Sequence, residues 1–279
     1  MTRLLRYRHD GLTFDVQDAG PLDGDPVVLL HGFPERHTCW RDVAPLLHAE
    51  GLRTYAPDQR GYSPGARPPR RRDYTMDRLE ADVVALIETI GAPVHLVGHD
   101  WGATSGWLVA MHRPDLVRTW TAISVPHPAA FRRAMLSSRQ ALASWYMGAF
   151  QTPLLPERLA ARPGGRFDQG LRHGGMTRED VARFRREVVD YGALPGGLNW
   201  YRAIPFTQQG SIADPVGVPT TLLWSDGDIA VKRVTVDRCR DHVTGPYELR
   251  VLEGVSHWIP THAPEAVAEA VLSRIEALA

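Results

Sequence analysis

The sequence predicts an α/β fold in which helices flank a mostly parallel central sheet and a helical insertion interrupts the core. Short β-branched runs alternate with helical patterns through the first half of the chain, which is typical of a parallel sheet. This alternation stops between about residues 126 and 209 and then resumes. With 279 residues, 43% of them hydrophobic, the chain is long enough to bury the core of one large domain. We therefore expect a core built from residues 1–125 and 210–279, with residues 126–209 as a helical lid.

The elements of the core can be placed from short sequence runs. Strands are expected at VVLL near residue 28, RTYAP near 54, VHLVG near 95, TWTAIS near 120, PTTLLWSD near 222 and YELRVLEG near 250. Between the second and third of these, apolar residues recur at helical spacing from Leu79 to Ile90, and Gly91 follows as a C-terminal stop. This helix is expected to cross over between parallel strands. Pro264 introduces a last helix.

The expected lid begins at PHPAAF and contains three Gly-rich breaks, RPGGRF, RHGG and LPGG. Helical patterns occur in SRQALASWYMGAF and in REDVARFRREVVDYG. The segment therefore predicts helices inserted between two strands of one sheet.

The charge balance bears on the kind of partner. Lys+Arg and Asp+Glu both number 32, so no net charge attracts nucleic acid or an anionic membrane, and we expect a neutral small molecule as the partner. The local basic run ARPPRRR, residues 66–72, is expected to be a solvated loop. Lys232 is the only lysine, which favours a GC-rich bacterial coding sequence as its source. A neutral surface is compatible with either a monomer or a homodimer.

The sequence also predicts a cytoplasmic location. The N-terminal segment lacks the apolar core of a signal peptide, and no apolar run approaches the roughly 18 residues of a membrane span. Cys39 and Cys239 show no paired-thiol or metal-ligand spacing, so we expect two free cysteines in a reducing compartment.

Residues 96–103, LVGHDWGA, match the pattern of a nucleophile elbow, the sharp strand-to-helix turn that presents a serine in many hydrolases. Gly98 and Gly102 would allow the tight turn, but the central position holds Asp100. One hypothesis is that this carboxylate only caps the following helix. The other is that Asp100, with a pKa near ~4, is ionised at neutral pH and attacks saturated carbon to form an ester. Water must then attack the ester, which requires a base and an oxyanion site.

The base and its acid are expected late in the chain, in the order nucleophile, acid, histidine. His257 follows the last expected strand, where a loop can bring it over the elbow, whereas His262 is expected at the surface and His99 is expected to point elsewhere. The loop SDGDIAV offers Asp226 and Asp228 as the acid. We favour Asp228, because a carboxylate at the second turn of this loop can reach the histidine. The acid would fix the imidazole tautomer and stabilise the imidazolium.

The oxyanion site is expected from two backbone N–H groups, that of Trp101 after the nucleophile and that of Phe33 in LLHGFPE. The same residues would also suit an ordinary strand-to-loop turn. Glu35 is expected to be an exposed carboxylate, with ordering of water near the site as the alternative. Phe33, Trp101 and Trp258 are expected to line the substrate pocket.

Together, HGFPE, DQRGYSPGARP, GHDWGA, WSDGD and GVSHW resemble the epoxide hydrolase branch of the α/β-hydrolase superfamily over nearly the whole chain. The resemblance implies an α/β-hydrolase fold with a helical lid and hydrolysis of a largely apolar epoxide to a vicinal diol. It also implies two lid tyrosines that donate to the epoxide oxygen, and Tyr146 in SWYMGAFQTP and Tyr201 in GGLNWYRA match them. Neutral tyrosine hydroxyls suit this task, although both could simply pack within the lid. Ser225 departs from the pattern, because many relatives have Gly there.

These residues predict one mechanism and leave two alternatives. Asp100 would attack a ring carbon, and His257, held by Asp228, would activate the water that hydrolyses the ester, with no metal, nucleotide or redox cofactor. A haloalkane or haloacid dehalogenase would use the same Asp100, Trp101 and His257. Haloalkane dehalogenases tend to carry Asn after the His-Gly pair, where this chain has Phe33. A hydrolase-like ligand-binding protein that has lost turnover would have no use for His257.

Overall fold

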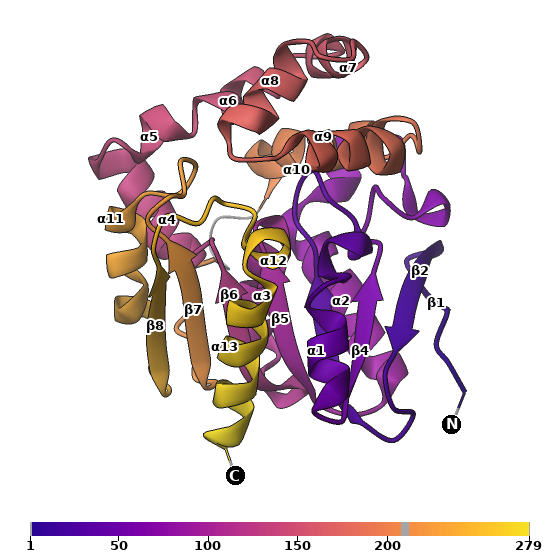
Figure 1. Ribbon diagram of the computed structural model, residues 1–279, viewed down its shortest axis with the longest axis vertical. Coiled ribbons are helices and arrows are strands. Elements are labelled where there is room, and N and C mark those ends of the chain that lie inside the picture. The colour runs from indigo at the N-terminus through magenta and orange to yellow at the C-terminus, as the bar shows by residue number, and fades with distance from the viewer. Residues whose placement is uncertain (1, 208–211, 279) are drawn as a thin grey trace.

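An eight-stranded sheet lies at the centre of the computed structural model, which describes residues 2–207 and 212–278 (Figure 1). The strand order is β1-β2-β4-β3-β5-β6-β7-β8. The strands are β1 (Arg6–His9), β2 (Leu12–Ala19), β3 (Asp25–Leu30), β4 (Leu52–Pro57), β5 (Val94–His99), β6 (Val117–Ile123), β7 (Thr220–Ser225) and β8 (Tyr247–Leu252). β2 pairs antiparallel with β1 and β4, and all the other pairs are parallel. The predicted α/β class with a mostly parallel sheet is confirmed.

The hairpin formed by β1 and β2 is absent from the sequence prediction. Both strands alternate polar residues with buried ones, among them Tyr7, Phe14 and Val16. Such alternation is typical of antiparallel strands with one face on the core, whereas the prediction relied on continuous apolar runs. Gly11 supports the tight connection with its positive φ of 72°.

Helices cover both faces of the sheet. The core helices are α1 (Ala44–Ala49), α2 (Met76–Ile90), α3 (Trp101–His112), α11 (Arg233–Asp237), α12 (Ile259–His262) and α13 (Pro264–Glu276). Five short 3-10 helices accompany them among the described residues: η1 (His37–Trp40), η2 (Pro64–Ala66), η3 (Arg71–Tyr74), η4 (Pro114–Leu116) and η8 (Cys239–His242). The predicted crossover helix is α2, which ends at Gly91 with a left-handed φ of 82°. The predicted last helix is α13.

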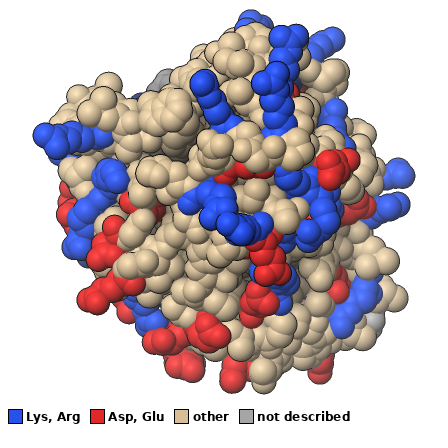
Figure 2. All heavy atoms as spheres, turned by 45° about the horizontal axis from the view of Figure 1, so that its top comes forward, with Lys and Arg blue, Asp and Glu red and all other residues tan. Residues whose placement is uncertain are grey.

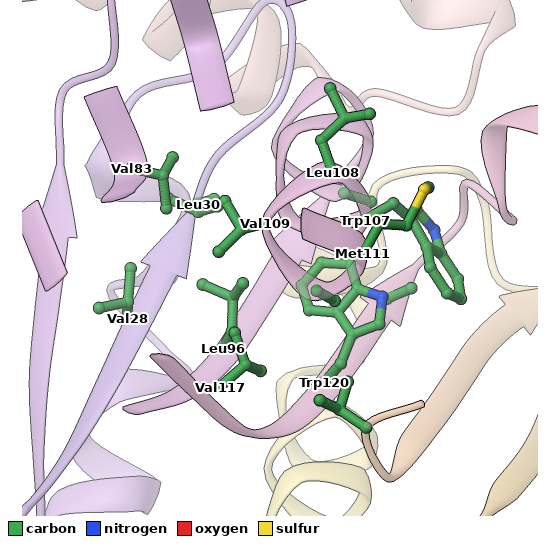
Figure 3. Close-up of a cluster of buried hydrophobic side chains, with 14 of the residues drawn as sticks. Val28, Leu30, Val83, Leu96, Trp107, Leu108, Val109, Met111, Val117 and Trp120 are labelled. Carbon is green, nitrogen blue, oxygen red and sulfur yellow. The ribbon is translucent and has the colours of Figure 1, made fainter. Parts of the chain in front are cut away.

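Strand β3 shows how the core is divided between the two faces. Val28 and Leu30 point into a cluster with α2 and α3, whereas Val27 and Leu29 point into a second cluster with α1 and α13. Figure 3 shows the first cluster, where Trp107 of α3 packs against Trp120 of β6. Burial of each valine or leucine side chain in these clusters contributes about 1.5–3 kcal/mol to folding. This two-sided burial explains why β3 appears in the sequence as an unbroken apolar run.

The segment between β6 and β7, called the lid from here on, consists mainly of helices joined by short turns and loops in the residues that the structure describes. It contains α4 (Pro128–Ser137), α5 (Gln140–Ala143), α6 (Trp145–Ala149), α7 (Leu155–Ala160), α8 (Arg166–His173), α9 (Arg178–Phe184), the π-helix η5 (Arg185–Val189), α10 (Leu194–Ala203) and η6 (Ile204–Phe206). In Figure 1 most of these helices lie beyond one end of the strands. The run SRQALASWYMGAF breaks into α5 and α6 at Ser144. The predicted end of the lid, at residues 209 and 210, falls within residues 208–211, which lie outside the described residues.

The basic run at residues 66–72 is exposed from Pro69 to Arg72, as expected of a solvated loop, and it also contacts the segment between β6 and β7. The Arg67 guanidinium donates to the carbonyl oxygens of Tyr62, at 2.7 Å, and of Tyr191, at 3.0 Å. The guanidinium groups of Arg71 and Arg72 lie 4.9 and 4.7 Å from the Phe206 ring centroid. The contacts with Tyr191 and Phe206 link the loop to residues more than a hundred positions away, which sequence composition cannot reveal.

Two further expectations concern the cysteines and membrane-spanning helices. Cys39 and Cys239 are buried and free, as predicted. Across residues 2–207 and 212–278, no helix combines the length and the apolar content that crossing a bilayer requires.

Candidate active site

Asp100 sits on a strained turn between β5 and α3. Its backbone adopts φ 53° and ψ −117°, a conformation that non-glycine residues rarely adopt. A Cβ at Gly98 would lie 2.5 Å from the Gly102 carbonyl oxygen, and a Cβ at Gly102 would lie 2.2 Å from that of Leu30, so both positions require glycine. The Asp100 side chain makes no capping hydrogen bond to α3. The helix-cap hypothesis is therefore wrong.

The imidazole of His257 lies between two carboxylates. Its Nδ1 atom is 2.7 Å from Oδ2 of Asp228, and its Nε2 atom is 3.5 Å from Oδ2 of Asp100. The three residues follow β8, β7 and β5, so the parallel strands bring their carboxyl ends together from distant parts of the sequence.

The two carboxylates set the charge of the histidine. Burial alone would lower the pKa of His257, but the charges of Asp228 and Asp100 and hydrogen bonds to them raise it to about 10. Burial alone would raise the pKa of Asp100, but the hydrogen bond and charge of His257 lower it. The site therefore holds an imidazolium–carboxylate pair at neutral pH.

Geometry separates the two candidate acids. Asp228 is buried, and its Oδ1 accepts from the N–H groups of Ala230 and Val231 at 2.7 and 2.9 Å. Asp226 is exposed, and its Oδ1 accepts from the N–H of Gly254 at 2.7 Å. Of the two carboxylates, only that of Asp228 is bonded to His257.

Ser225, which stands where many relatives have Gly, does not disturb the loop that carries Asp228. Its hydroxyl donates to the Val255 carbonyl oxygen at 2.5 Å and accepts from the Gly227 N–H at 3.3 Å. The serine thus links the acid loop to the loop that carries His257.

Glu35 is 5% exposed, so the expectation of an exposed carboxylate is wrong. Arg183 of α9 covers it and lies 3.2 Å from its Oε1. Its Oε2 lies 3.7 Å from Nδ1 of His99, and neither atom has a hydrogen-bond partner within the described residues. Burial raises the pKa of Glu35. The cover comes from the lid, which no local pattern around residue 35 could indicate.

The other two histidines that the sequence analysis weighed have structural contacts. Nε2 of His99 donates to the His257 carbonyl oxygen at 2.9 Å, so its side chain points away from the Asp100 carboxylate as expected. His262 is not on the open surface: Nδ1 lies 2.7 Å from the Ser256 hydroxyl, and Nε2 lies 3.0 Å from Asp180 Oδ2 at the start of α9. It therefore links the core to the lid.

Phe33 and Trp101, which are expected to supply the oxyanion N–H groups, both lie next to Asp100. The Phe33 N–H donates to Oδ1 of Asp100 at 2.8 Å, and Trp101 begins α3 directly after Asp100. The Phe33 ring packs edge-on against Tyr201, at 5.2 Å between ring centroids, and against Phe150, at 5.5 Å. The backbone of Phe33 thus faces Asp100 while its ring belongs to the lid cluster.

A cavity of about 260 Å³ opens at Asp100. Trp101, Tyr146 and Tyr201 line it. Its other walls are mostly apolar: Met76, Thr104, Val125, Pro128, Phe131, Arg132, Met135, Leu136, Met147, Ile204, Thr207, Ile212 and Val231. Burial, followed by the negative charge of Asp100, raises the pKa of both tyrosines, so both hydroxyls remain protonated.

Two predicted pocket residues lie outside this cavity. Trp258 packs against Met176 and Val181 under the lid, and the Phe33 ring packs into the aromatic cluster described above. The sequence analysis also missed the wall formed by α4. Phe131 and Met135 are four residues apart on that helix, and this spacing could have indicated a common face.

The described residues contain no group of three or more His, Cys, Asp or Glu side chains that could hold a metal ion.

Comparison with known proteins identifies the family to which the chain belongs. Residues 25–262 match the α/β hydrolase fold family. The chain is 34% identical to AB hydrolase superfamily protein YfhM of Bacillus subtilis, over 96% of each chain. It is 32% identical to epoxide hydrolase 3 of Xenopus tropicalis, over 94% of this chain and 74% of that protein. The crystal structure of epoxide hydrolase VrEH1 from Vigna radiata superposes with a TM-score of 0.82 at 27% identity, over 98% of this chain and 97% of that chain. The chain therefore belongs to the α/β-hydrolase superfamily, in its epoxide hydrolase branch.

Proposed function

We propose that the protein is an epoxide hydrolase that converts a largely apolar epoxide to a vicinal diol through an ester on Asp100. The observation that carries this proposal is a shared cavity: Asp100 and the two lid tyrosines, Tyr146 and Tyr201, line the same apolar space. A dehalogenase would need the carboxylate and the histidine, but it would have no use for two hydroxyl donors opposite the nucleophile.

In the first step, a carboxylate oxygen of Asp100 attacks a ring carbon and the bond from that carbon to the epoxide oxygen breaks. Tyr146 and Tyr201 donate hydrogen bonds to the oxygen as negative charge develops on it. The esterified Asp100 no longer carries a charge, so two of the effects that raise the pKa of His257 disappear. His257 then releases its proton, which neutralises the alkoxide. The histidine thus becomes a neutral base after the ester has formed.

In the second step, neutral His257 takes a proton from water, and the hydroxide adds to the carbonyl carbon of the ester. The N–H groups of Phe33 and Trp101 stabilise the resulting oxyanion. Asp228 holds Nδ1 of the imidazole and stabilises its positive charge, which leaves Nε2 to face the water. Collapse expels the diol, whose new hydroxyl takes the proton of the added hydroxide. The enzyme returns to Asp100 carboxylate and His257 imidazolium, so charge and protons balance over the cycle.

The test is diol formation from aryl and alkyl epoxides, with a single-turnover reaction in heavy-oxygen water. Mass analysis of the peptide that contains Asp100 should show the label in its carboxylate, because water attacks the Asp100 carbonyl and not the substrate. Asp100→Ala should abolish turnover. Release of halide from haloalkanes or haloacids, with epoxides untouched, would replace this proposal with a dehalogenase. Binding of epoxides without ester formation would indicate a protein that has lost turnover.

A further inference from the structure

The outer rim of the lid exposes large apolar side chains in one short stretch of sequence. Leu136 is 85% exposed, Leu142 72% and Trp145 71%, and Leu154 and Leu155 are exposed as well. These five residues lie within 20 positions of one another, although the described chain exposes only ten large apolar side chains. In Figure 1, α5 lies at the upper left and α6 and α7 lie along the top of the molecule, all on the side away from the lower ends of the strands. Such a concentration is uncommon on a surface that faces only water.

The same stretch is strongly basic. Between Pro128 and Arg166 the charged residues are six arginines and Glu157, and Glu157 pairs with Arg202 at 2.7 Å. The arginines are Arg132, Arg133, Arg139, Arg158, Arg162 and Arg166, and all six are exposed. The net charge of zero for the whole chain therefore hides an uneven distribution. In Figure 2 acidic side chains gather mainly on the lower half of the view, whereas arginines dominate toward the top.

We define the lid crest as the five exposed apolar residues Leu136, Leu142, Trp145, Leu154 and Leu155 together with these six arginines. We propose that the lid crest docks on the surface of an anionic lipid bilayer. Leucine and tryptophan side chains enter the boundary between headgroups and acyl chains, and arginines bind the phosphate groups around them.

Electrostatics favours an anionic lipid surface over a second copy of the chain as the partner of the lid crest. A second copy of the chain docked crest to crest would bring two sets of arginines together, which is unfavourable. An anionic lipid surface offers both the phosphates and the apolar layer that the crest requires.

The crest is also continuous with the cavity. Leu136 and Arg132 belong to the crest and line the cavity that opens at Asp100, and Tyr146 follows Trp145 directly. An apolar ligand dissolved in the bilayer can therefore reach the cavity without crossing water. This last point rests on the proposed function, whereas docking itself does not depend on any activity.

The test is co-sedimentation of the full chain with phosphatidylcholine vesicles, with and without phosphatidylglycerol. We expect binding to the anionic vesicles that weakens as salt is added, and little binding to phosphatidylcholine alone. Arg139→Gln with Arg162→Gln should lower the partition coefficient about 25-fold, since each arginine near such a surface contributes roughly fivefold. The matched control, Arg6→Gln with Arg8→Gln on β1, should change it less than about twofold. Leu142→Ser should also weaken binding, whereas Leu5→Ser, another exposed leucine, should not.

Vesicle binding is measured without turnover, so its failure is distinct from failure of the proposed function. Circular dichroism of each variant separates loss of docking from loss of folding. No binding to anionic vesicles at low salt, or equal losses in the crest and β1 variants, would overturn the proposal. Sedimentation velocity supplies a further check: a dimer of the native chain that Leu142→Ser dissociates would assign the crest to self-association.

Discussion

Nδ1 of His257 lies 2.7 Å from Oδ2 of Asp228, and this hydrogen bond directs the other ring nitrogen, Nε2, toward Asp100. Two backbone N–H groups fix the second oxygen of Asp228, so the carboxylate cannot turn away. The orientation of the base is thus determined by a buried acid that never contacts the cavity.

Replacement of this acid should impair the second step more than the first. Asp228→Asn keeps the shape of the side chain but removes the charge that stabilises the imidazolium, so ester hydrolysis should slow by about 10³-fold or more. Rapid-quench kinetics should then show an ester that accumulates on Asp100. Asp226→Asn is the control, because the Asp226 side chain is exposed and is bonded to the Gly254 N–H and not to His257, and it should retain nearly the full rate. The reverse result would make Asp226 the acid.

The two tyrosines should act in ring opening. Tyr146→Phe and Tyr201→Phe should each slow ester formation by about 10²-fold, and the double variant should be slower still, because the alkoxide loses its donors. Single-turnover measurement of the ester by mass spectrometry reports this step directly. Tyr191→Phe removes a hydroxyl from a lid tyrosine outside the cavity, where Arg36 lies 3.7 Å from its ring centroid, and should leave the rate unchanged. Nearly full activity in the double variant would favour a dehalogenase.

The charge of Asp100 should control the pKa of His257. In Asp100→Asn, the pKa of the imidazole should fall from about 10, because one of its two negative neighbours is gone while Asp228 remains. Titration of the His257 ring protons by NMR measures this shift. An unchanged pKa would mean that the charge of Asp100 does not hold the proton on His257. The proposed loss of that proton when Asp100 is esterified would then have no physical basis.

The raised pKa of His257 also predicts how stability depends on pH. A histidine whose folded pKa exceeds its unfolded value of about 6.5 adds stability that is complete below that pH. This stability is lost as pH rises through the folded value of about 10. Urea unfolding of the wild type should therefore show a decline in this window, and Asp100→Asn should show a smaller one. If the stability of the two proteins declined equally over this pH range, the charge of Asp100 would not be a cause of the raised pKa of His257.

The turn at Asp100 should tolerate no side chain at Gly102. Gly102→Ala places a Cβ 2.2 Å from the backbone oxygen of Leu30, so it should lower the free energy of unfolding by about 3 kcal/mol. Gly148→Ala is the matched control, because nothing lies within 4 Å of a Cβ there, and it should raise stability by up to about 1 kcal/mol within α6. Urea unfolding of both variants measures this difference. Similar free energies of unfolding would show that the turn at Asp100 can shift to accommodate a Cβ at residue 102.

Features that depend on neighbours along the chain could be predicted from the sequence. The apolar runs predicted the parallel strands, the spacing from Leu79 to Ile90 predicted α2, and the small residues around Asp100 predicted the turn. The order of nucleophile, acid and histidine also predicted that Asp100, His257 and either Asp226 or Asp228 lie together, because the carboxyl ends of parallel strands meet at one edge of a sheet.

Contacts between distant segments, in contrast, became evident from the folded chain alone. It buried Glu35 under Arg183, tied His262 to Asp180 and moved Trp258 away from the cavity, because the lid packs on the core across more than 70 residues of sequence separation. The lid crest is a similar case, since net charge is a sum over the whole chain and the fold decides where each charge lies. Local patterns specify turns, strands and helices, but burial and electrostatic environment are set by what the fold brings together.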